Sequence, residues 1–279
     1  MSALPRNHTT MSSEFTLGPD AAHLHEFYQW AVQDPEYEID FTLEQFRRRR
    51  GREPRLLRED FCGTALVACR WVERHDAHRA IGLDVDGATL DWGRRHNVER
   101  LNGASDRVDL RREDVRTITS PGADVVQALN FSWYLLQTRV ELVRYFRAVR
   151  ESLAPGGIFM LDCFGGWEHQ QTYRDRHTID VPQGTFGFEW EQVDYNPITN
   201  LSRCCIHFAF RDGERMDNAF EYDLRIYSPS EVRDALESAG FSHIEFFSDH
   251  AEDDSYSDYR PVEKIEPDDA WVLYVIADG

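Results

Sequence analysis

The chain of 279 residues is long enough for one α/β domain with an insertion. Its 50 acidic residues outnumber the 31 basic ones, and the formal net charge of -19 repels phosphate backbones, so we expect no nucleic-acid partner. No apolar run approaches the ~20 residues of a membrane span, so we expect no membrane partner either.

The N-terminal segment contains two predicted helices. Residues 1–18 are predicted to be disordered, and the apolar spacing over 20–34 predicts the first helix. A second helix is predicted to begin with a capping box at Thr42 and to end at Gly51. The four arginines at 47–50 then occupy its last turn, where cations face the negative end of the helix dipole.

From residue 55 onward the apolar pattern alternates between strands and helices. The expected strands are 55–59, 80–84, 108–112, 124–129 and 158–163, and the expected helices are 64–74, 88–101 and 139–153. Such alternation implies parallel strands joined by right-handed crossovers, with helices on both faces. The fold class predicted is α/β, with a doubly wound, Rossmann-like sheet.

The pattern changes after Gly166. Aromatic residues alternate over 186–190 and again over 206–210, on either side of a turn at 196–197, which predicts an inserted antiparallel β-hairpin. Its aromatic face consists of Phe186, Phe188, Trp190, Phe208 and Phe210.

The C-terminal part returns to the main sheet. A helix is predicted over 228–240, opened by proline at its first position, followed by strands at 244–247 and 271–277 with an irregular acidic loop over 249–269 between them. The predicted organisation is a disordered N-terminus (1–18), N-terminal helices that form a lid (19–54), a cofactor-binding core (55–165), a substrate-capping hairpin (166–227), and a C-terminal helix and strands that complete the sheet (228–279).

The cysteine pattern favours a reducing compartment. The count is odd and no pair has metal-ligand spacing, so we expect buried thiols and no metal. The first ten residues are polar and lack an apolar signal region, which agrees with a cytoplasmic location. The cysteines are Cys62, Cys69, Cys163, Cys204 and Cys205.

Ligands of open α/β sheets bind beyond the carboxyl ends of the strands. The first predicted strand ends at Glu59 and leads into a tight turn and a helix N-terminus, whose backbone N–H groups can approach a ligand. A dinucleotide-binding turn needs glycines that are missing here, and Glu59 would repel a pyrophosphate, so a cationic ligand portion fits better. The turn is Phe61-Cys62-Gly63-Thr64-Ala65.

Carboxylates follow the next two strands as well. Asp84 ends the second strand, where an acid can accept hydrogen bonds from ribose hydroxyls, while Asp86 can cap the following helix. Asp114, followed by the apolar Val115, can accept from an adenine amino group, with a solvated turn acid as the alternative. The fourth strand ends in Asn130-Phe131-Ser132-Trp133-Tyr134, typical of a pocket floor, although Trp133 and Tyr134 equally suit the core.

Together these motifs resemble class I S-adenosylmethionine-dependent methyltransferases, over roughly residues 20–279. They are Glu59-x-Phe-x-Gly63-x-Ala65, Gly82-x-Asp84, Asp114-Val115 and Leu153-Ala154-Pro155-Gly156-Gly157. The family usually has glycine where this chain has Phe61 and Ala65, and the variant loop is similar to that of a bacterial subgroup.

The resemblance implies S-adenosylmethionine as the cofactor and a seven-stranded, mostly parallel sheet whose last strand is antiparallel. It places Glu59 near the methionyl amino group, Asp84 at the ribose, Asp114 at the adenine and Asn130 on the route to the methyl group. The implied cofactor-binding residues are Glu59, Phe61, Cys62, Gly63, Thr64, Asp84, Val85, Asp114, Val115, Asn130 and Phe131.

Methyl transfer is an in-line displacement that depends on holding nucleophile and methyl group collinear in a dry pocket. A general base is needed only for a protonated or weak nucleophile. The candidate catalytic residues are Asn130, His169 and Tyr173, with Asp162 and His177 as further candidates. Tyr28 and Trp30 could belong to a lid, although an apolar stripe at helical spacing is ordinarily core.

The sequence therefore favours a cytoplasmic methyltransferase that acts on an N, O or S nucleophile of a small-molecule substrate. The aromatic hairpin suits such an acceptor, including a cationic amine held by cation–π contact; burial of the rings or a homodimer interface are the alternatives. Two other functions stay open. One is a catalytically silent S-adenosylmethionine-binding or interaction protein, and the other, disfavoured by the missing glycines, is a nicotinamide oxidoreductase.

Overall fold

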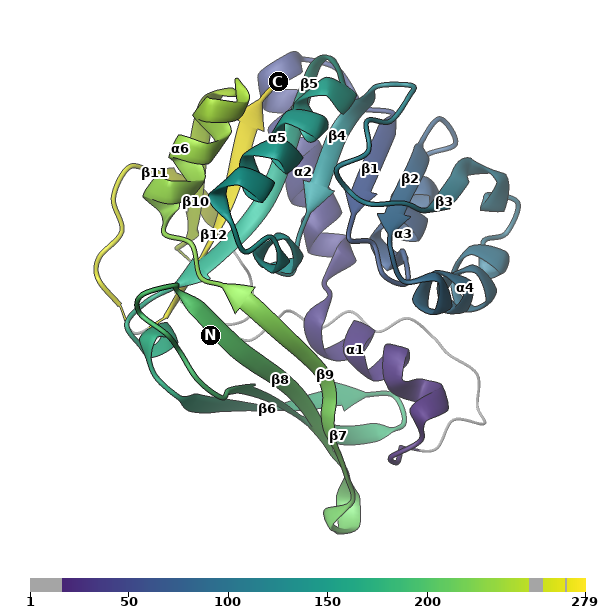
Figure 1. Cartoon of the computed structure of the whole chain (residues 1–279). Coiled ribbons are helices and arrows are strands. Elements are labelled where there is room, and N and C mark those ends of the chain that lie inside the picture. The colour runs from purple at the N-terminus through teal and green to yellow at the C-terminus, as the bar shows by residue number, and fades with distance from the viewer. Residues whose placement is uncertain (1–16, 251–257, 269) are drawn as a thin grey trace.

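The computed structural model describes residues 17–250, 258–268 and 270–279, and within them the chain forms two β-sheets (Figure 1). The larger sheet contains β1 Leu56–Asp60, β2 Arg79–Asp84, β3 Val108–Arg112, β4 Ala123–Ala128, β5 Leu153–Gly165, β10 Ser242–Asp249, β11 Tyr259–Val262 and β12 Trp271–Asp278. Their spatial order is β11-β10-β12-β5-β4-β1-β2-β3.

The first five strands are parallel, and β12 runs antiparallel to both β5 and β10. The predicted mostly parallel sheet is therefore present, but its predicted count of seven strands is wrong. The extra strand is β11, which pairs with β10 inside the stretch predicted to be an irregular loop. Strand β11 is stabilised by the ring of Tyr259. Its centroid lies 4.6 Å from that of Tyr274, 6.1 Å from that of Phe41 and 5.9 Å from that of Tyr37.

Helices cover both faces of this sheet, as the alternating pattern predicts. The helices α2 Pro35–Arg50, α3 Leu66–Arg74 and α4 Gly87–His96 pack on one face, and α5 Arg139–Ser152 and α6 Pro229–Ala239 on the other. Capping boxes open α5 and α6, and Gly240 closes α6. Short 3-10 turns occupy Ala21–His23, Val98–Arg100, Ser105–Arg107, Ser132–Leu135, Glu168–Gln170 and Arg211–Gly213.

The predicted start of the second helix at Thr42 is wrong. Helix α2 begins at Pro35, and the Asp34 carboxylate caps it by accepting from the Tyr37 N–H at 3.3 Å. Proline fits the first helical position because that position needs no N–H donor. Thr42 lies mid-helix, where its hydroxyl donates to the Glu38 carbonyl at 2.7 Å.

The end of α2 agrees with the prediction. Gly51 closes the helix in a left-handed conformation, and the arginines of the last turn are held by acidic partners. Arg47 pairs with Glu53 at 2.6 Å and Arg50 with Asp278 at 3.0 Å. These arginines therefore stabilise the fold through ion pairs.

Several predictions concern residues only partly described. The segment predicted to be disordered lies, as far as residue 16, outside the described residues, as do 251–257 and 269 of the predicted acidic loop.

The five cysteines are buried free thiols. No helix in the described part of the chain is long and apolar enough to cross a membrane.

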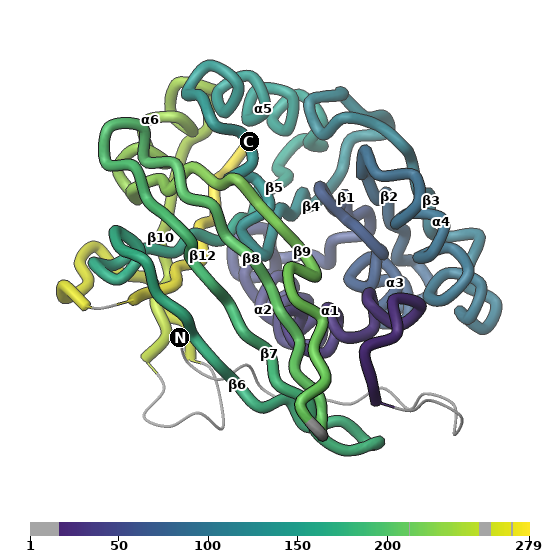
Figure 2. Tube along the Cα trace, turned by 60° about the horizontal axis from the view of Figure 1, so that its bottom comes forward, coloured from purple at the N-terminus to yellow at the C-terminus, as the bar shows by residue number. Residues whose placement is uncertain are grey.

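The insertion is a four-stranded antiparallel sheet, larger than the predicted hairpin. Its strands are β6 Tyr173–Val181, β7 Gly184–Gln192, β8 Leu201–Ala209 and β9 Arg215–Arg225, paired in that order. We call it the second sheet. It lies below the carboxyl ends of the main strands, with helix α1 Leu24–Val32 alongside it (Figures 1 and 2).

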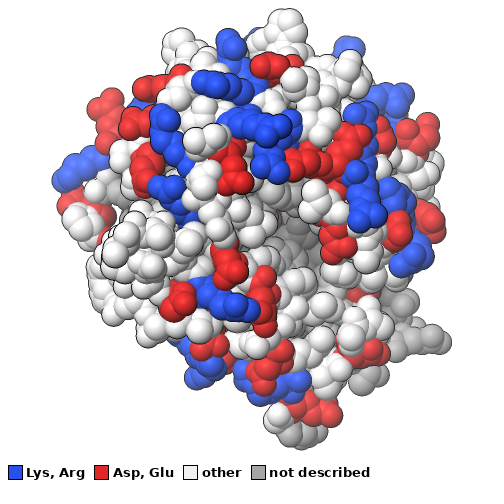
Figure 3. Space-filling view, in the orientation of Figure 1, with Lys and Arg blue, Asp and Glu red and all other residues white. Residues whose placement is uncertain are grey.

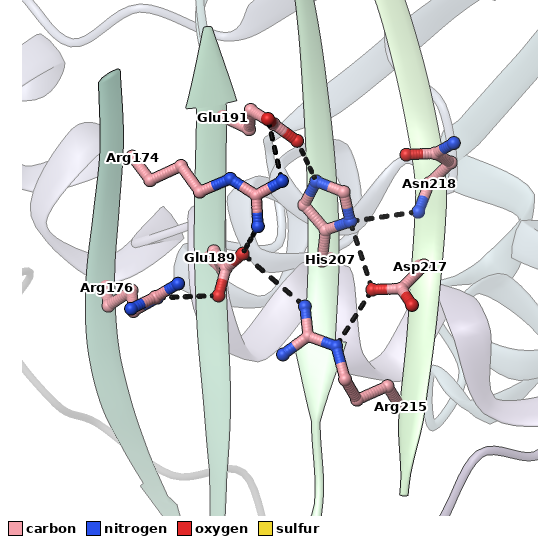
Figure 4. Close-up of polar contacts among 8 residues, drawn as sticks. All are labelled: Arg174, Arg176, Glu189, Glu191, His207, Arg215, Asp217 and Asn218. Atoms are coloured by element: carbon pink, nitrogen blue, oxygen red, sulfur yellow. Dashed lines mark hydrogen bonds and ion pairs between the residues drawn. The ribbon is translucent and has the colours of Figure 1, made fainter. Parts of the chain in front are cut away.

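Charged side chains tie the four strands of the second sheet together on one face (Figure 4). At its centre, the buried carboxylate of Glu189 accepts from Arg174 and Arg176 at 2.7 Å each and faces Arg215 at 3.4 Å. His207 joins the network through Glu191 at 3.0 Å. The charges on β6 and β9 mask the apolar alternation of those strands, which explains why the sequence indicated only β7 and β8.

Candidate functional site

The loop between β1 and α3 contains three left-handed residues in alternation. Phe61, Gly63 and Ala65 have φ values of 54°, 52° and 56°. A residue with a side chain costs about 1–2 kcal/mol in this conformation. The chain nevertheless adopts it at two non-glycine positions. The Ala65 N–H closes the turn by donating to the Cys62 carbonyl at 2.7 Å, and the Cys62 N–H joins the loop to β2 by donating to the Leu83 carbonyl at 3.0 Å. The loop thus keeps a glycine-type backbone without the glycines.

Two carboxylates, Asp84 and Glu59, stabilise this region by accepting hydrogen bonds from backbone N–H groups. Asp84, at the end of β2, accepts from the backbone N–H of Gly63 at 2.8 Å and of Asp86 at 2.9 Å. Glu59 accepts from the Ala68 N–H, in the first turn of α3, at 2.8 Å. A carboxylate offers about four acceptor positions, so both side chains retain capacity for a ligand. Asp86 caps α4, as predicted.

The ends of β2 and β3 form the next part of the site. Val85 is 64% exposed, an apolar side chain at the sheet edge. The Asp114 carboxylate accepts from the Arg116 guanidinium at 2.8 Å, and this hydrogen bond lowers the pKa of Asp114. Val115 is buried, and its carbonyl accepts from the buried Arg58 guanidinium at 2.6 Å. Arg58 also pairs with Asp60 at 2.7 Å, so it links the loops after β1 and β3.

The end of β4 is held by a carboxylate from β5. Asn130 and Phe131 are both left-handed, with φ values of 57° and 59°. Asp162 accepts from their backbone N–H groups at 2.6 and 3.0 Å. Trp133 and Tyr134 of the same stretch are buried and pack with Tyr227, so they belong to the core.

Three buried carboxyls gather behind these loops: Glu38 of α2, Glu59 and Asp162. Burial raises the pKa of Glu59 to about 8, and the Ala68 N–H opposes that shift. Burial likewise raises the pKa of Asp162 to about 7, against the N–H groups of Phe131 and Asn130. The pKa of Glu38 lies well above its usual value through burial and the charges of Asp162, Asp34 and Glu59.

A cavity of about 1360 Å³ opens between the main sheet, the second sheet and helices α1 and α2. Figure 3 shows a hollow between the two layers of the molecule. Asn130, Phe131 and His169 line the cavity, whereas Glu59, Asp84, Asp114 and Tyr173 do not. The predicted cofactor-binding residues therefore fall into two groups. Those at the ends of β1, β2 and β3, which we call the shelf, do not line the cavity, whereas Asn130 and Phe131 at the end of β4 do.

His169 and Tyr173 are brought together by the second sheet, with 2.9 Å between the His169 Nδ1 and the Tyr173 hydroxyl. Burial lowers the pKa of His169 to about 4 and raises that of Tyr173. Neither group is therefore tuned to exchange a proton near neutral pH. His177 lines the cavity and pairs with Asp175 at 2.9 Å.

The aromatic face of the second sheet divides into two parts. Phe186, Phe208 and Phe210 pack against Phe27 of α1, with ring centroids 5.2, 5.6 and 5.0 Å away. This part is core. Phe188 and Trp190 line the cavity, as do Tyr28 and Trp30 of α1.

Sequence reasoning missed some residues that shape the site. Gln29 of α1 donates to the Thr64 hydroxyl at 2.7 Å, which closes α1 over the loop after β1. Glu38 was hidden because the second helix was predicted to begin after it. Thr42 and Gln45, its neighbours on the buried face of α2, are polar as well, so the residue pattern does not mark this face as buried. No group of three or more His, Cys, Asp or Glu side chains in the described part of the chain is placed to hold a metal ion.

Solved structures share this architecture. An S-adenosylmethionine-dependent methyltransferase from Clostridium acetobutylicum aligns with a TM-score of 0.68 at 16% identity, over 91% of this chain and 96% of that chain. An amino pentose methyltransferase from Micromonospora echinaspora, solved with S-adenosylmethionine bound, aligns at 0.67 and 17% identity, over 97% and 99%. A sugar N-methyltransferase from Streptoalloteichus aligns at 0.62 and 19% identity, over 98% and 99%.

No family model matches the chain, and no curated protein matches its sequence. The likeness is thus one of fold. The chain shares the overall fold of these solved structures and has a mostly parallel main sheet and an antiparallel second sheet. Its structural neighbours are S-adenosylmethionine-dependent methyltransferases, some of them solved with the donor or with S-adenosylhomocysteine bound.

Proposed function

We propose that this protein transfers a methyl group from S-adenosylmethionine to a nucleophile on a small molecule. The observation that carries the proposal is the alternating left-handed loop 61–65, which Asp84 braces at 2.8 Å and which leads directly to Leu66, a residue that lines the large cavity. The sugar and amino pentose methyltransferases among the structural neighbours support a small-molecule acceptor.

The residues at the strand ends fit the donor. Asp84 has acceptor positions left for the ribose hydroxyls, and the exposed Val85 offers an apolar surface for the adenine ring. Glu59 suits a cationic amino group because its buried carboxyl has no cationic partner among the described residues. When bound, the donor supplies an electrophilic methyl group on a positively charged sulfur.

The protein's own residues exclude water and shape the acceptor site. Helix α1 is held to the loop by Gln29 and to the second sheet by Phe27, so it excludes water as a lid. Asn130, fixed by Asp162, lines the path between shelf and cavity. His169 lines the acceptor side of the cavity, and Tyr173 positions it through the 2.9 Å contact with its Nδ1.

Calorimetric titration with S-adenosylhomocysteine tests the donor site. We expect Asp84→Ala to weaken binding by ~10–100-fold, since hydrogen bonds to a charged group contribute about 1.5–3 kcal/mol. The matched control is Asp91→Ala, an exposed acid in α4, which should bind as the wild type does. Equal affinities of all three proteins would refute the assignment of Asp84.

Two further results separate the alternatives. Tighter binding of a nicotinamide dinucleotide than of S-adenosylhomocysteine would favour an oxidoreductase. Normal S-adenosylhomocysteine binding without methyl transfer to any of a broad panel of amines, alcohols and thiols would favour a silent binding protein.

A further inference from the structure

Glu38 is a buried carboxyl with one unpartnered oxygen, although the carboxyl also forms a hydrogen bond with the backbone of Asp34. Its side chain is only 4% exposed, and its Oε2 atom is buried with no hydrogen-bond partner among the residues that the structure describes. The residue lines the cavity. A buried polar group that is left unpaired is destabilising by ~1–3 kcal/mol or more, and a charged one by more still. Glu38 is therefore poised for a group that arrives with a ligand.

The surroundings of Glu38 define the charge of that group. The charges that act most strongly on Glu38 are those of Asp162, Asp34 and Glu59, and all three are carboxyls. Tyr28 and Tyr274 line the same cavity, and the phenol groups of both interact electrostatically with Glu38. Carboxyls among aromatic faces attract a cation through both Coulomb and cation–π contact.

The strand order assigns this cation to the acceptor. Asp162 of β5 lies opposite Tyr274 of β12 in the antiparallel ladder, and Glu38 interacts with both. The shelf proposed for the donor lies on the other side of β4, at the ends of β1, β2 and β3. Glu38 and Asp162 both line the cavity, which the second sheet also lines through Phe188 and Trp190.

We propose that the acceptor is a small-molecule amine, and that Glu38 and Asp162 bind its amino group as an ammonium ion. This inference rests on the proposed methyl transfer and adds the chemical class of the substrate. An ammonium nitrogen has no free lone pair, so one proton passes from it to the Glu38 carboxylate. The nitrogen then forms the new N–C bond while the C–S bond of the sulfonium breaks, and the electron pair of that bond stays on sulfur. The methylated nitrogen keeps one positive charge.

Cation binding is expected to displace a proton. Burial and the carboxyls of Asp162, Asp34 and Glu59 raise the pKa of Glu38, which favours its protonated form in the absence of a cation. An ammonium ion stabilises the ionised form instead, which releases that proton to the buffer. A group with a purely structural role would show no such release.

Titration calorimetry with matched probes tests the proposal. Benzylamine is compared with benzyl alcohol, and glucosamine with glucose, on the S-adenosylhomocysteine-loaded protein in two buffers of different ionisation enthalpy. We expect at least one amine to bind at least tenfold more tightly than its neutral partner, with proton release. Glu38→Gln should lose at least tenfold of that amine affinity and the proton release. Glu44→Gln, an exposed acid of the same helix, is the matched control and should retain both.

The outcomes distinguish this proposal from the proposed function. Amine binding that is equal in Glu38→Gln and Glu44→Gln, or amines that bind no better than their neutral partners, would overturn the role of Glu38. A loss of S-adenosylhomocysteine affinity in Glu38→Gln with unchanged amine affinity would assign Glu38 to the donor instead, which also overturns it. Failure of the wild type to bind S-adenosylhomocysteine would refute the proposed function, and the amine titration without it would still report on Glu38.

Discussion

The carboxylate of Asp162 accepts a hydrogen bond from the backbone N–H of Asn130 at 2.6 Å. This contact joins the end of β5 to the end of β4, where the proposed donor shelf meets the cavity. Asn130 is left-handed, and so is Phe131, which donates to the same carboxylate at 3.0 Å. One side chain therefore satisfies two backbone donors in a strained turn.

Replacing this acceptor is expected to loosen the turn. In Asp162→Asn, the amide NH₂ group can donate but cannot accept, so one of the two backbone N–H groups is left without a partner. We expect the free energy of unfolding to fall by ~1–3 kcal/mol, measured by urea denaturation at pH 7. Asp109→Asn, an exposed acid paired with Arg111, is the control and should change stability by less than ~0.5 kcal/mol. A smaller loss for Asp162→Asn than for the control would contradict this role.

The buried Glu59 makes stability depend on pH. Its pKa is about 8 in the folded protein, against an ordinary value near 4.5, so the folded state holds a proton that the unfolded chain releases between these values. Its contribution to stability is complete below the unfolded pKa and is lost as pH rises through the folded one. We expect the free energy of unfolding to fall between about pH 5 and pH 8 by roughly 1–3 kcal/mol more in the wild type than in Glu59→Gln. Glu44→Gln should follow the wild type, and parallel curves for Glu59→Gln and the wild type would show that Glu59 is not responsible.

Gly93 allows α4 to lie directly on the loop after β1. A β-carbon at this position would approach the Thr64 carbonyl oxygen to 2.5 Å and the Thr64 Cα to 2.9 Å. Backbone cannot move aside as a flexible side chain can, so Gly93→Ala should shift the loop. We expect a stability loss of ~1–3 kcal/mol together with weaker S-adenosylhomocysteine binding. In Gly87→Ala, made in the same helix, the new methyl would meet only the side chain of Arg112, at 3.2 Å. Donor affinity that falls equally in both variants would argue against the backbone contact.

The second sheet depends on Glu189 at the centre of its charged face (Figure 4). This buried carboxylate faces Arg174, Arg176 and Arg215, and these arginines lower its pKa against the effect of burial. Glu189→Gln removes the negative charge and leaves the cations to repel one another, so we expect a stability loss of ~1–3 kcal/mol. Glu221→Gln removes an exposed acid paired with Arg203 and should cost less than ~1 kcal/mol. Thermal unfolding would rank the two, and the reverse order would show that the network does not hold the sheet.

The sequence predicted best those strands whose residues are buried along most of their length. Strands β1, β4 and β5 are covered on both faces, so their apolar runs stand out, and the capping box at Thr138 is a local signal that needs no tertiary context. The residues proposed for the donor site could be named because they directly follow the predicted strands β1–β4. Asp162 was visible as a single acid in an apolar strand.

Other features depend on contacts between distant segments. The polar residues of β6 and β9 alternate with half-buried ones, and the ion pairs that explain them come from partner strands. Glu38 looks like an ordinary acid near the start of a helix, and only the packing of α2 against the main sheet buries it. Phe61 and Ala65 look incompatible with a glycine-type turn until the neighbouring hydrogen bonds that hold it are seen.

The position of helix α1 is expected to affect how fast a bound donor leaves the site. It is fastened to the loop after β1 by Gln29 and to the second sheet by Phe27, so the shelf and the cavity are closed by the same element. We expect a donor bound beneath α1 to leave faster when the contacts of Phe27 with the second sheet are weakened. If the proposed donor binds here, its residence time after methyl transfer should depend on the packing of a phenylalanine that does not line the cavity, and we expect product release to limit turnover while the chemical step stays fast.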